Sequence, residues 1–279
     1  MQAIISLLTA AVSLVFAAVV FDQYLERRRS YQLAWTVGIL MYAAATGAEA
    51  AFWLLRHNES AFRLWYFFGA VNAAAYLGLG SVFLLARPWT RWSLWMVLGG
   101  FVLSAAVLAL PIPLLARLFI ITPVLSVVAV LFVPARVLAA ILVLASTGAA
   151  IALFTAAVDQ TVLAGLSSLT GEGVLPQGVR LMTPFFNIFG SVALVGGAAW
   201  SAWTAVRRQA PAFRFYSTLL IAVGGFFPSV GGLLARFGVP EPLALSLLFG
   251  IIIIFIGVLR ASPQFGISRI PLVQALRQT

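Results

Sequence analysis

The chain has no cysteine and no lysine among its 279 residues, and it has a single histidine, His57. Without cysteine there are no disulfide bonds, no thiolate chemistry and no cysteine-based zinc sites. Without lysine, covalent attachment of retinal is excluded. One histidine and isolated acidic residues do not make a closed ligand set for a metal. The composition therefore predicts no metal and no other cofactor.

Charged residues of any kind are also scarce. They make up 9% of the chain, whereas 63% of the residues are hydrophobic and the mean hydropathy is +1.08. A soluble domain has about 25% charged residues. Apolar runs of about 17 to 25 residues, each able to cross roughly 30 Å of hydrocarbon as a helix, follow one another along the chain. We therefore expect an all-α, polytopic transmembrane bundle that forms one domain over residues 1–279, with the lipid bilayer as its partner.

The apolar runs predict about nine membrane spans. Residues 92–133 allow two counts: "LPIPLL" at 110–115 indicates either two tight spans or a re-entrant pair, and the re-entrant pair would leave seven crossings. The last span, 243–260, is followed by a short cytoplasmic tail at 261–279. The expected spans are 3–21, 33–55, 62–86, 92–110, 114–133, 137–157, 180–205, 215–235 and 243–259.

The arginines predict the orientation. They lie singly or in short groups between apolar runs instead of lining a groove, which disfavours nucleic acid as a partner. If the N-terminus is outside, twelve of the seventeen basic residues lie on the cytoplasmic side, as the positive-inside rule requires. The use of arginine alone, in an alanine-rich chain, indicates a bacterial protein. We expect a multi-pass protein of the inner (plasma) membrane with its N-terminus outside and its C-terminus inside.

Weak internal similarity indicates a duplication. Residues 62–86 align without gaps on 179–203, matching Arg63 with Arg180 and Gly80 with Gly197, and "TGA" and "GGF" recur in the same order in both halves. Four spans per copy would keep both copies in the same orientation. The expected parallel repeats are 1–113 and 114–237, followed by one extra helix at 243–260.

A few polar residues lie inside the apolar spans. Tyr42, Thr46 and Glu49 share one face of the second span, because they are four and three residues apart. Asn72 and Asn187 come at a similar depth in the third and seventh spans. The spacing predicts a polar layer in the outer half of the membrane.

Glu49 has two interpretations. An acidic side chain at this depth costs roughly 3 kcal/mol and normally faces a cavity, the bundle interior or a counter-ion. In the first interpretation it lines a cavity and binds a cation, a proton or a polar solute. In the second it forms a buried ion pair with Arg63 or Arg180 that sets helix register, and Tyr42 and Tyr76 are core packing.

Two other segments have alternative interpretations. "GGFFPSVGG" at 224–232 places Pro228 among glycines, which indicates either a broken helix or close packing. The connection 158–179 is either a cap over a cavity or a loop on the headgroups. No catalytic constellation is found, so the sequence does not indicate an enzyme.

Residues 26–70, "ERRRSYQLAWTVGILMYAAATGAEAAFWL" with "SAFRLWYFFGA", resemble the N-terminal multi-span sensory module of bacterial histidine kinases. The segment from "FYSTLLIAVGGFF" onward is similar to uncharacterised actinobacterial multi-span proteins. The first resemblance implies a sensor, and since no kinase domain follows Arg260 in this sequence, such a sensor would signal through a partner.

These observations favour a protein that binds or moves a small solute or lipid through a cavity in its outer half. The alternative is a sensory module or an accessory subunit of a larger membrane complex, whose partner is another membrane protein.

The arginine distribution leads to a prediction about topology. A reporter fused after Thr279 should be active if it works in the cytoplasm and inactive if it needs the periplasm, because the basic connections stay inside. A fusion with the opposite activities would show that the orientation is wrong.

Overall fold

The fold is described by a computed structural model for residues 2–85, 91–109, 114–236, 239 and 242–261. Within these ranges all regular secondary structure is helical. The helices are α1 (Gln2–Arg27), α2 (Ser30–Leu54), α3 (Glu59–Trp65), the π-helical η1 (Tyr66–Ala73), α4 (Ala74–Leu85), α5 (Arg91–Leu108), α6 (Leu114–Phe132), α7 (Ala135–Thr155), α8 (Gln160–Ala164), α9 (Gln177–Arg180), α10 (Met182–Ser191), the π-helical η2 (Val192–Gly196), α11 (Gly197–Arg207), α12 (Ala212–Arg236) and α13 (Leu243–Arg260).

Seven helices are long and apolar enough to cross a membrane, and they fit a membrane-spanning protein. Two of them are compound: α3, η1 and α4 form one rod over Glu59–Leu85, and α9 to α11 form another over Gln177–Arg207. The described apolar parts of α5 and α6, Trp95–Leu108 and Ile120–Phe132, are shorter. The helical membrane fold is therefore confirmed, while nine crossings stay a prediction. Residues 262–279 of the predicted tail lie outside the described residues.

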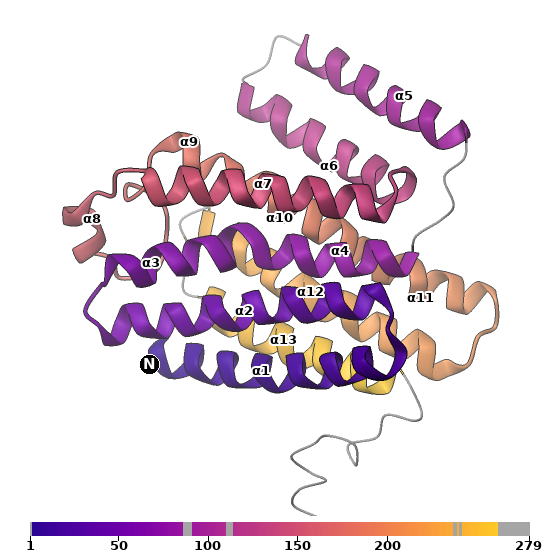
Figure 1. Ribbon diagram of the computed structural model, residues 1–279, viewed down its shortest axis with the longest axis horizontal. Helices are drawn as coiled ribbons and strands as arrows, with labels where there is room; N and C mark the ends of the chain where they lie inside the picture. Colours follow the sequence, from indigo (N-terminus) through magenta and orange to yellow (C-terminus); the bar gives the residue numbers. More distant parts are fainter. Residues whose placement is uncertain (1, 86–90, 110–113, 237–238, 240–241, 262–279) are drawn as a thin grey trace, which may run out of the picture.

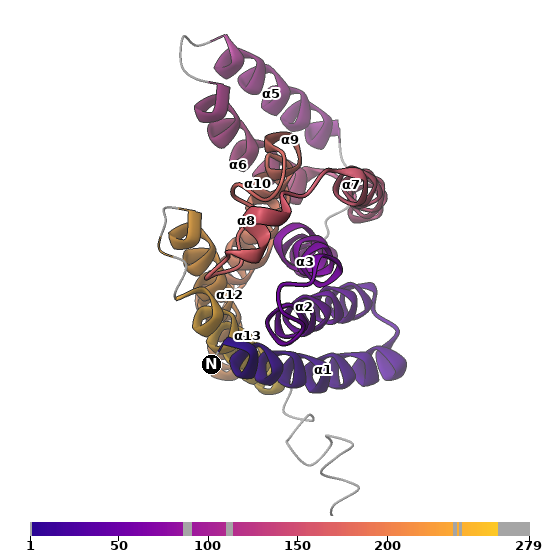
Figure 2. The ribbon, with the colours of Figure 1, turned by 90° about the vertical axis from the view of Figure 1, so that its left-hand side faces the viewer.

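The long helices lie side by side (Figure 1). Seen end-on, α1, α2 and α3 follow one another on one side and α12 and α13 lie on the other, while α5 lies farthest from α1 (Figure 2). Helix α5 packs on α6, and α6 packs on α10. We call the end that holds the starts of α1 and α3 the N-terminal end and the opposite end the Arg27 end.

Helices α1 and α2 form a tight antiparallel hairpin. Arg28 adopts the left-handed conformation, with φ of 52°, and its amide donates to the Tyr24 carbonyl oxygen at 2.7 Å. Helix α2 begins two residues later, at Ser30. Because the turn is so short, the two helices pack against each other along their lengths.

The two compound rods, Glu59–Leu85 and Gln177–Arg207, cross at the centre through two glycines. A β-carbon on Gly78 would lie 2.9 Å from the Gly190 α-carbon, and one on Gly190 would collide with the Ala74 backbone. Farther along, Gly197 lies against Ser81, so both helices run in the same direction. Small residues allow this approach, as is usual where membrane helices cross.

The predicted duplication is not confirmed. Both crossing rods contain a π-helical segment, η1 and η2. Their neighbours differ, however, because α1 packs extensively on α2, whereas the matching pair α6 and α7 has no comparable packing among the described residues.

Of the two interpretations of Pro228, the broken helix is wrong and close packing holds, because α12 is continuous from Ala212 to Arg236 with this proline inside it. Pro228 packs on Gly250 of α13, where a β-carbon would lie 2.6 Å from the proline Cδ. Proline has no N–H, so the carbonyl of Gly224, four residues earlier, lacks its usual helix hydrogen bond. Because Gly250 has no β-carbon, it also leaves room for this carbonyl. The neighbouring helix thus accommodates the proline.

The glycine crossing leads to a stability prediction. Gly190→Ala should lower the unfolding temperature in detergent by several degrees, because overpacking a tight contact costs about 1–3 kcal/mol. Gly196→Ala in the same rod is the matched control, since a β-carbon there meets nothing within 4 Å. Equal unfolding temperatures for the two variants would contradict the crossing.

Candidate functional site

Glu49 lies at the α1–α2 interface near the N-terminal end, with 8% of its surface exposed. Its carboxyl forms a hydrogen bond with the Ser6 side chain on α1. The Ser6 hydroxyl lies 3.0 Å from the Gln2 carbonyl oxygen, to which it donates. The Ser6 hydroxyl, which has one proton, thus lies between this carbonyl oxygen and the Glu49 carboxyl.

The arginines proposed as counter-ions bind other groups. Arg63 pairs with Glu59 at 2.6 Å, and its guanidinium also donates to the carbonyl oxygens of Leu153 and Ala156 at the end of α7. The interpretation of Arg63 as the partner of Glu49 is therefore wrong in geometry, because this side chain caps α7, where a cation is favoured.

Arg180 also lies apart from Glu49. It forms an exposed ion pair with Glu172, at 3.6 Å. The carboxylate that pairs with it is supplied by the loop before α9.

Two residues of the Glu49 face make contacts of different kinds. The Tyr42 hydroxyl donates to the Leu247 carbonyl oxygen of α13 at 2.8 Å, and Tyr42 also interacts electrostatically with Glu49. Thr46 donates to the Tyr42 carbonyl oxygen of its own helix at 3.0 Å. Tyr42, Thr46 and Glu49 are all buried, so this face is turned away from lipid.

Asn72 belongs to a separate polar cluster between η1 and α7. It is fully buried; its amide donates to the Phe67 carbonyl oxygen at 2.9 Å, and its oxygen accepts from the Ser146 hydroxyl at 2.6 Å. The Tyr76 hydroxyl lies 3.4 Å from the Ser146 oxygen. A π-helical segment disturbs the normal backbone pairing, and Asn72 supplies a partner to one of its carbonyls.

Asn187 joins the rod Gln177–Arg207 to the π-helical segment η1. Its amide donates to the Ala70 carbonyl oxygen of η1 at 2.8 Å and to the Thr183 carbonyl oxygen at 3.0 Å. The single polar layer predicted from depth is therefore two groups: one around Glu49 between α1 and α2, and one around Asn72 between η1, α7 and α10.

The loop between α7 and α9 is a folded cap at the N-terminal end. The Asp159 amide donates to the Val174 carbonyl oxygen at 3.1 Å, which closes the loop, and Leu163 and Leu175 are buried against the helices. Hydrogen bonds from the Thr161 hydroxyl and from two backbone amides hold the pKa of Asp159 below its usual value. The buried side chains of the loop pack on the ends of α2 and α7.

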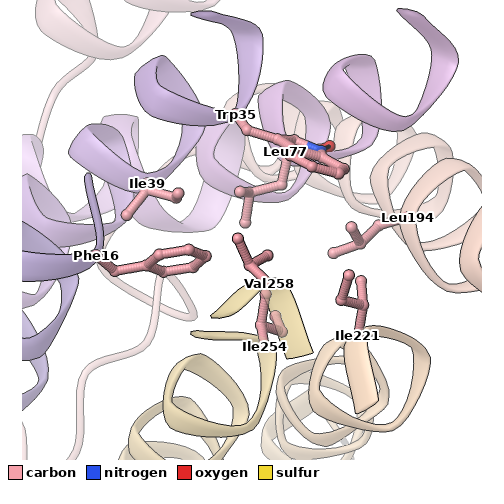
Figure 3. A pocket seen from close by; sticks show the side chains of 8 residues that line it. All are labelled: Phe16, Trp35, Ile39, Leu77, Leu194, Ile221, Ile254 and Val258. Carbon is pink, nitrogen blue, oxygen red and sulfur yellow. Dashed lines mark hydrogen bonds between the residues drawn. The ribbon is translucent and has the colours of Figure 1, made fainter. Parts of the chain in front are cut away.

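A small apolar pocket lies at the meeting point of six helical segments, on the side of the bundle middle toward the Arg27 end (Figure 3). None of the residues of the predicted polar layer lines it. The Trp35 indole forms one wall and donates to the Leu77 carbonyl oxygen at 3.1 Å, in a space that exists because residue 80 is glycine. The lining residues are Phe16, Trp35, Ile39, Leu77, Leu194, Ile221, Ile254 and Val258.

Sequence reasoning missed several buried hydroxyl groups. Ser6, Thr9 and Ser13 of α1 are almost completely buried, and Ser146 of α7 contacts Asn72. Their spacing of three and four residues on α1 was visible as a stripe on one helix face. Only the antiparallel packing on α2 shows which polar groups this stripe meets.

No family model, curated protein or solved structure matches the chain. The fold therefore defines the class, a helical membrane-spanning protein, and the arrangement of its own residues has to define the site.

The position of Arg63 leads to a test of its structural role. Arg63→Gln should lower the unfolding temperature in detergent by roughly 5 °C, because hydrogen bonds to a charged group contribute about 1.5–3 kcal/mol. Arg180→Gln is the control and should have little effect, since its ion pair is exposed. A large effect of Arg180→Gln with none of Arg63→Gln would contradict the cap.

Proposed function

We propose that this chain is a bacterial inner-membrane protein that binds a small positively charged solute, a proton in the simplest case, at Glu49 in its outer half. In this proposal α5 and α6 complete nine crossings, and the N-terminal end faces outward. The observation that carries it is a buried carboxyl between α1 and α2 whose candidate counter-ions bind other acids.

The charge balance supports this function. An uncompensated carboxylate inside the membrane is costly, so its negative charge must be neutralised by a cation or a proton. Among the described residues, the charged groups on the elements packed against this part of α2 are Glu59 and Arg63 of α3, which pair with each other. Helix α1 offers Ser6 there, and Tyr42 is the titratable neighbour on α2 itself. We therefore expect a cation or a proton from solution to neutralise the Glu49 carboxylate.

The surroundings of Glu49 also suit a small ligand or water. Trp53, one turn farther along α2, has a buried indole N–H with no hydrogen-bond acceptor among the described residues. Buried donors are usually paired, by protein or by ordered water. Trp53 and Glu49 share a helix face, so a hydrated site at this level would serve both.

A second candidate function is that of a sensory or accessory subunit. It is favoured by the α5–α6 hairpin, in which α5 packs on α6 and presents large apolar side chains such as Trp95 and Phe101. A partner helix or lipid would cover this surface equally well. We favour the Glu49 site because its chemistry selects one kind of ligand.

The test compares the pH dependence of stability in the parent and in Glu49→Gln. If the folded protein holds a proton on Glu49, raising the pH removes it and destabilises the parent, because stability falls with pH wherever the native state binds more protons. The glutamine variant mimics the neutral carboxyl, so its unfolding temperature should lack this fall. The expected difference at alkaline pH is at least about 2 °C, the shift that about 1 kcal/mol produces in a chain of this size.

Glu172→Gln is the control, because that carboxylate is exposed. It should keep the pH dependence of the parent. Sodium, potassium and choline are then added at alkaline pH, and a cation that binds at Glu49 should restore the stability of the parent alone. Identical pH profiles for the parent and Glu49→Gln, with no response to any cation, would contradict the proposed function.

A further inference from the structure

Polar side chains of α1 and α2 lie opposite one another along the hairpin. Ser6 is hydrogen-bonded to Glu49, and nearer the Arg27 end Phe16 and Ile39 line the same pocket. In an antiparallel pair, each step forward along one helix matches a step back along the other. The sum of two facing residue numbers is therefore constant, and it is the same for Ser6 with Glu49 as for Phe16 with Ile39.

This register brings two further polar pairs together. It places Thr9 opposite Thr46 and Ser13 opposite Tyr42, and all four residues are buried. The hydroxyls of Thr9 and Ser13 donate to carbonyls of their own helix, at 2.7 Å each, so their oxygens remain acceptors. We call this group the polar seam; it consists of Ser6, Thr9, Ser13, Tyr42, Thr46 and Glu49.

A second polar pair lies beyond the pocket. The same register places Gln23 opposite Gln32 near the Arg27 end, and Gln32 has 1% of its surface exposed. Its side-chain oxygen is buried without a hydrogen-bond donor among the described residues. A buried acceptor without a protein partner is a position for ordered water.

The pocket separates the polar seam from the glutamine pair. Its walls at this level are Phe16, Ile39, Trp35 and Val258, whose side chains converge on the empty space in Figure 3. The indole N–H of Trp35 is already bonded to the Leu77 carbonyl. Water needs polar partners to occupy a small cavity, so this one is dry.

We propose that the α1–α2 interface is a proton path between Glu49 and the Arg27 end, interrupted by the apolar pocket, which acts as a dewetted barrier. This inference rests on the proposed function, because Glu49 is its proton-binding group. Hydrophobic constrictions close channels in the same way, by excluding water and not by filling the space.

The proton balance along this path is simple. When water enters the pocket, the proton leaves the Glu49 carboxyl. Each hydroxyl of the polar seam accepts a proton on its oxygen and turns its own proton from the helix carbonyl to the next oxygen. The new water carries the last proton to the solution beyond Gln32. A proton from solution at the N-terminal end then restores the carboxyl. No oxidant, reductant or other reactant takes part.

The experiment measures passive proton flux in vesicles that contain the purified protein and a trapped pH indicator, after a pH step with the membrane potential clamped. The parent should hold the gradient as well as protein-free vesicles. Ile39→Thr keeps the branched shape but adds a hydroxyl to the pocket, and it should raise the flux at least tenfold. Val258→Thr, nearly the same size as the original side chain, is the second variant and keeps the test valid if Ile39→Thr does not fold.

Two further variants make the result specific. Ile256→Thr is the matched control, because Ile256 is 42% exposed and does not line the pocket; its flux should equal that of the parent. Glu49→Gln added to the leaky variant should abolish the leak. Helix content and gel filtration confirm that each variant is folded.

Each other result overturns a different part. Folded pocket variants without a leak overturn the path, and a leaky parent overturns the barrier. If the proton leak persists without Glu49, protons cross through water without using the carboxyl. That result overturns the role of the polar seam. The proposed binding of a proton at Glu49 is tested separately, by comparing the pH dependence of the unfolding temperature in the parent and in Glu49→Gln. None of the flux results changes that comparison.

Discussion

The structure depends on one constraint: a polar group inside a bilayer must find its partner within the protein, because lipid offers none. The hydroxyls of α1 meet it by bonding to carbonyls one turn back in their own helix. The π-helical segment η1 meets it through the amides of Asn72 and Asn187. The end of α7 meets it through the guanidinium of Arg63. The bonds of Asn187 and Arg63 join elements that are far apart in the sequence. The bonds of the α1 hydroxyls stay within one helix.

Much of the architecture followed from the sequence because membrane helices are long and apolar, so hydropathy and length locate them. The expected span 33–55 is α2, Ser30–Leu54, and 215–235 is α12, Ala212–Arg236. The burial of Glu49 and Asn72 also followed, since a polar side chain in an apolar run is turned inward. These are local properties, which a single helix expresses without its neighbours.

The partners of these residues did not follow from the sequence. The sequence offered Arg63 as a counter-ion for Glu49, yet position along a span says nothing of the direction in which each side chain points. Arg63 faces α7, whereas Glu49 faces α1. The π-helical segments were also invisible, because their extra residue alters the backbone pairing without a characteristic composition. The two interpretations of Pro228 stayed open for a related reason, since the glycine that accommodates it, Gly250, belongs to another helix.

The two polar groups differ in what they leave unsatisfied. In the Asn72 cluster the amide and the oxygen of Asn72 both have protein partners, and both amide hydrogens of Asn187 are donated. A ligand would have to displace these bonds, so this cluster is best suited to holding η1 against α7 and α10. The Glu49 group keeps a buried carboxyl that forms no ion pair with an arginine of the described residues. One turn farther along α2, the buried indole N–H of Trp53 has no acceptor within the same part of the chain. If register alone were needed there, a serine or threonine would supply a hydrogen bond without the cost of an acid. The acid is the part of the arrangement that packing does not require, and for that reason it carries the functional argument.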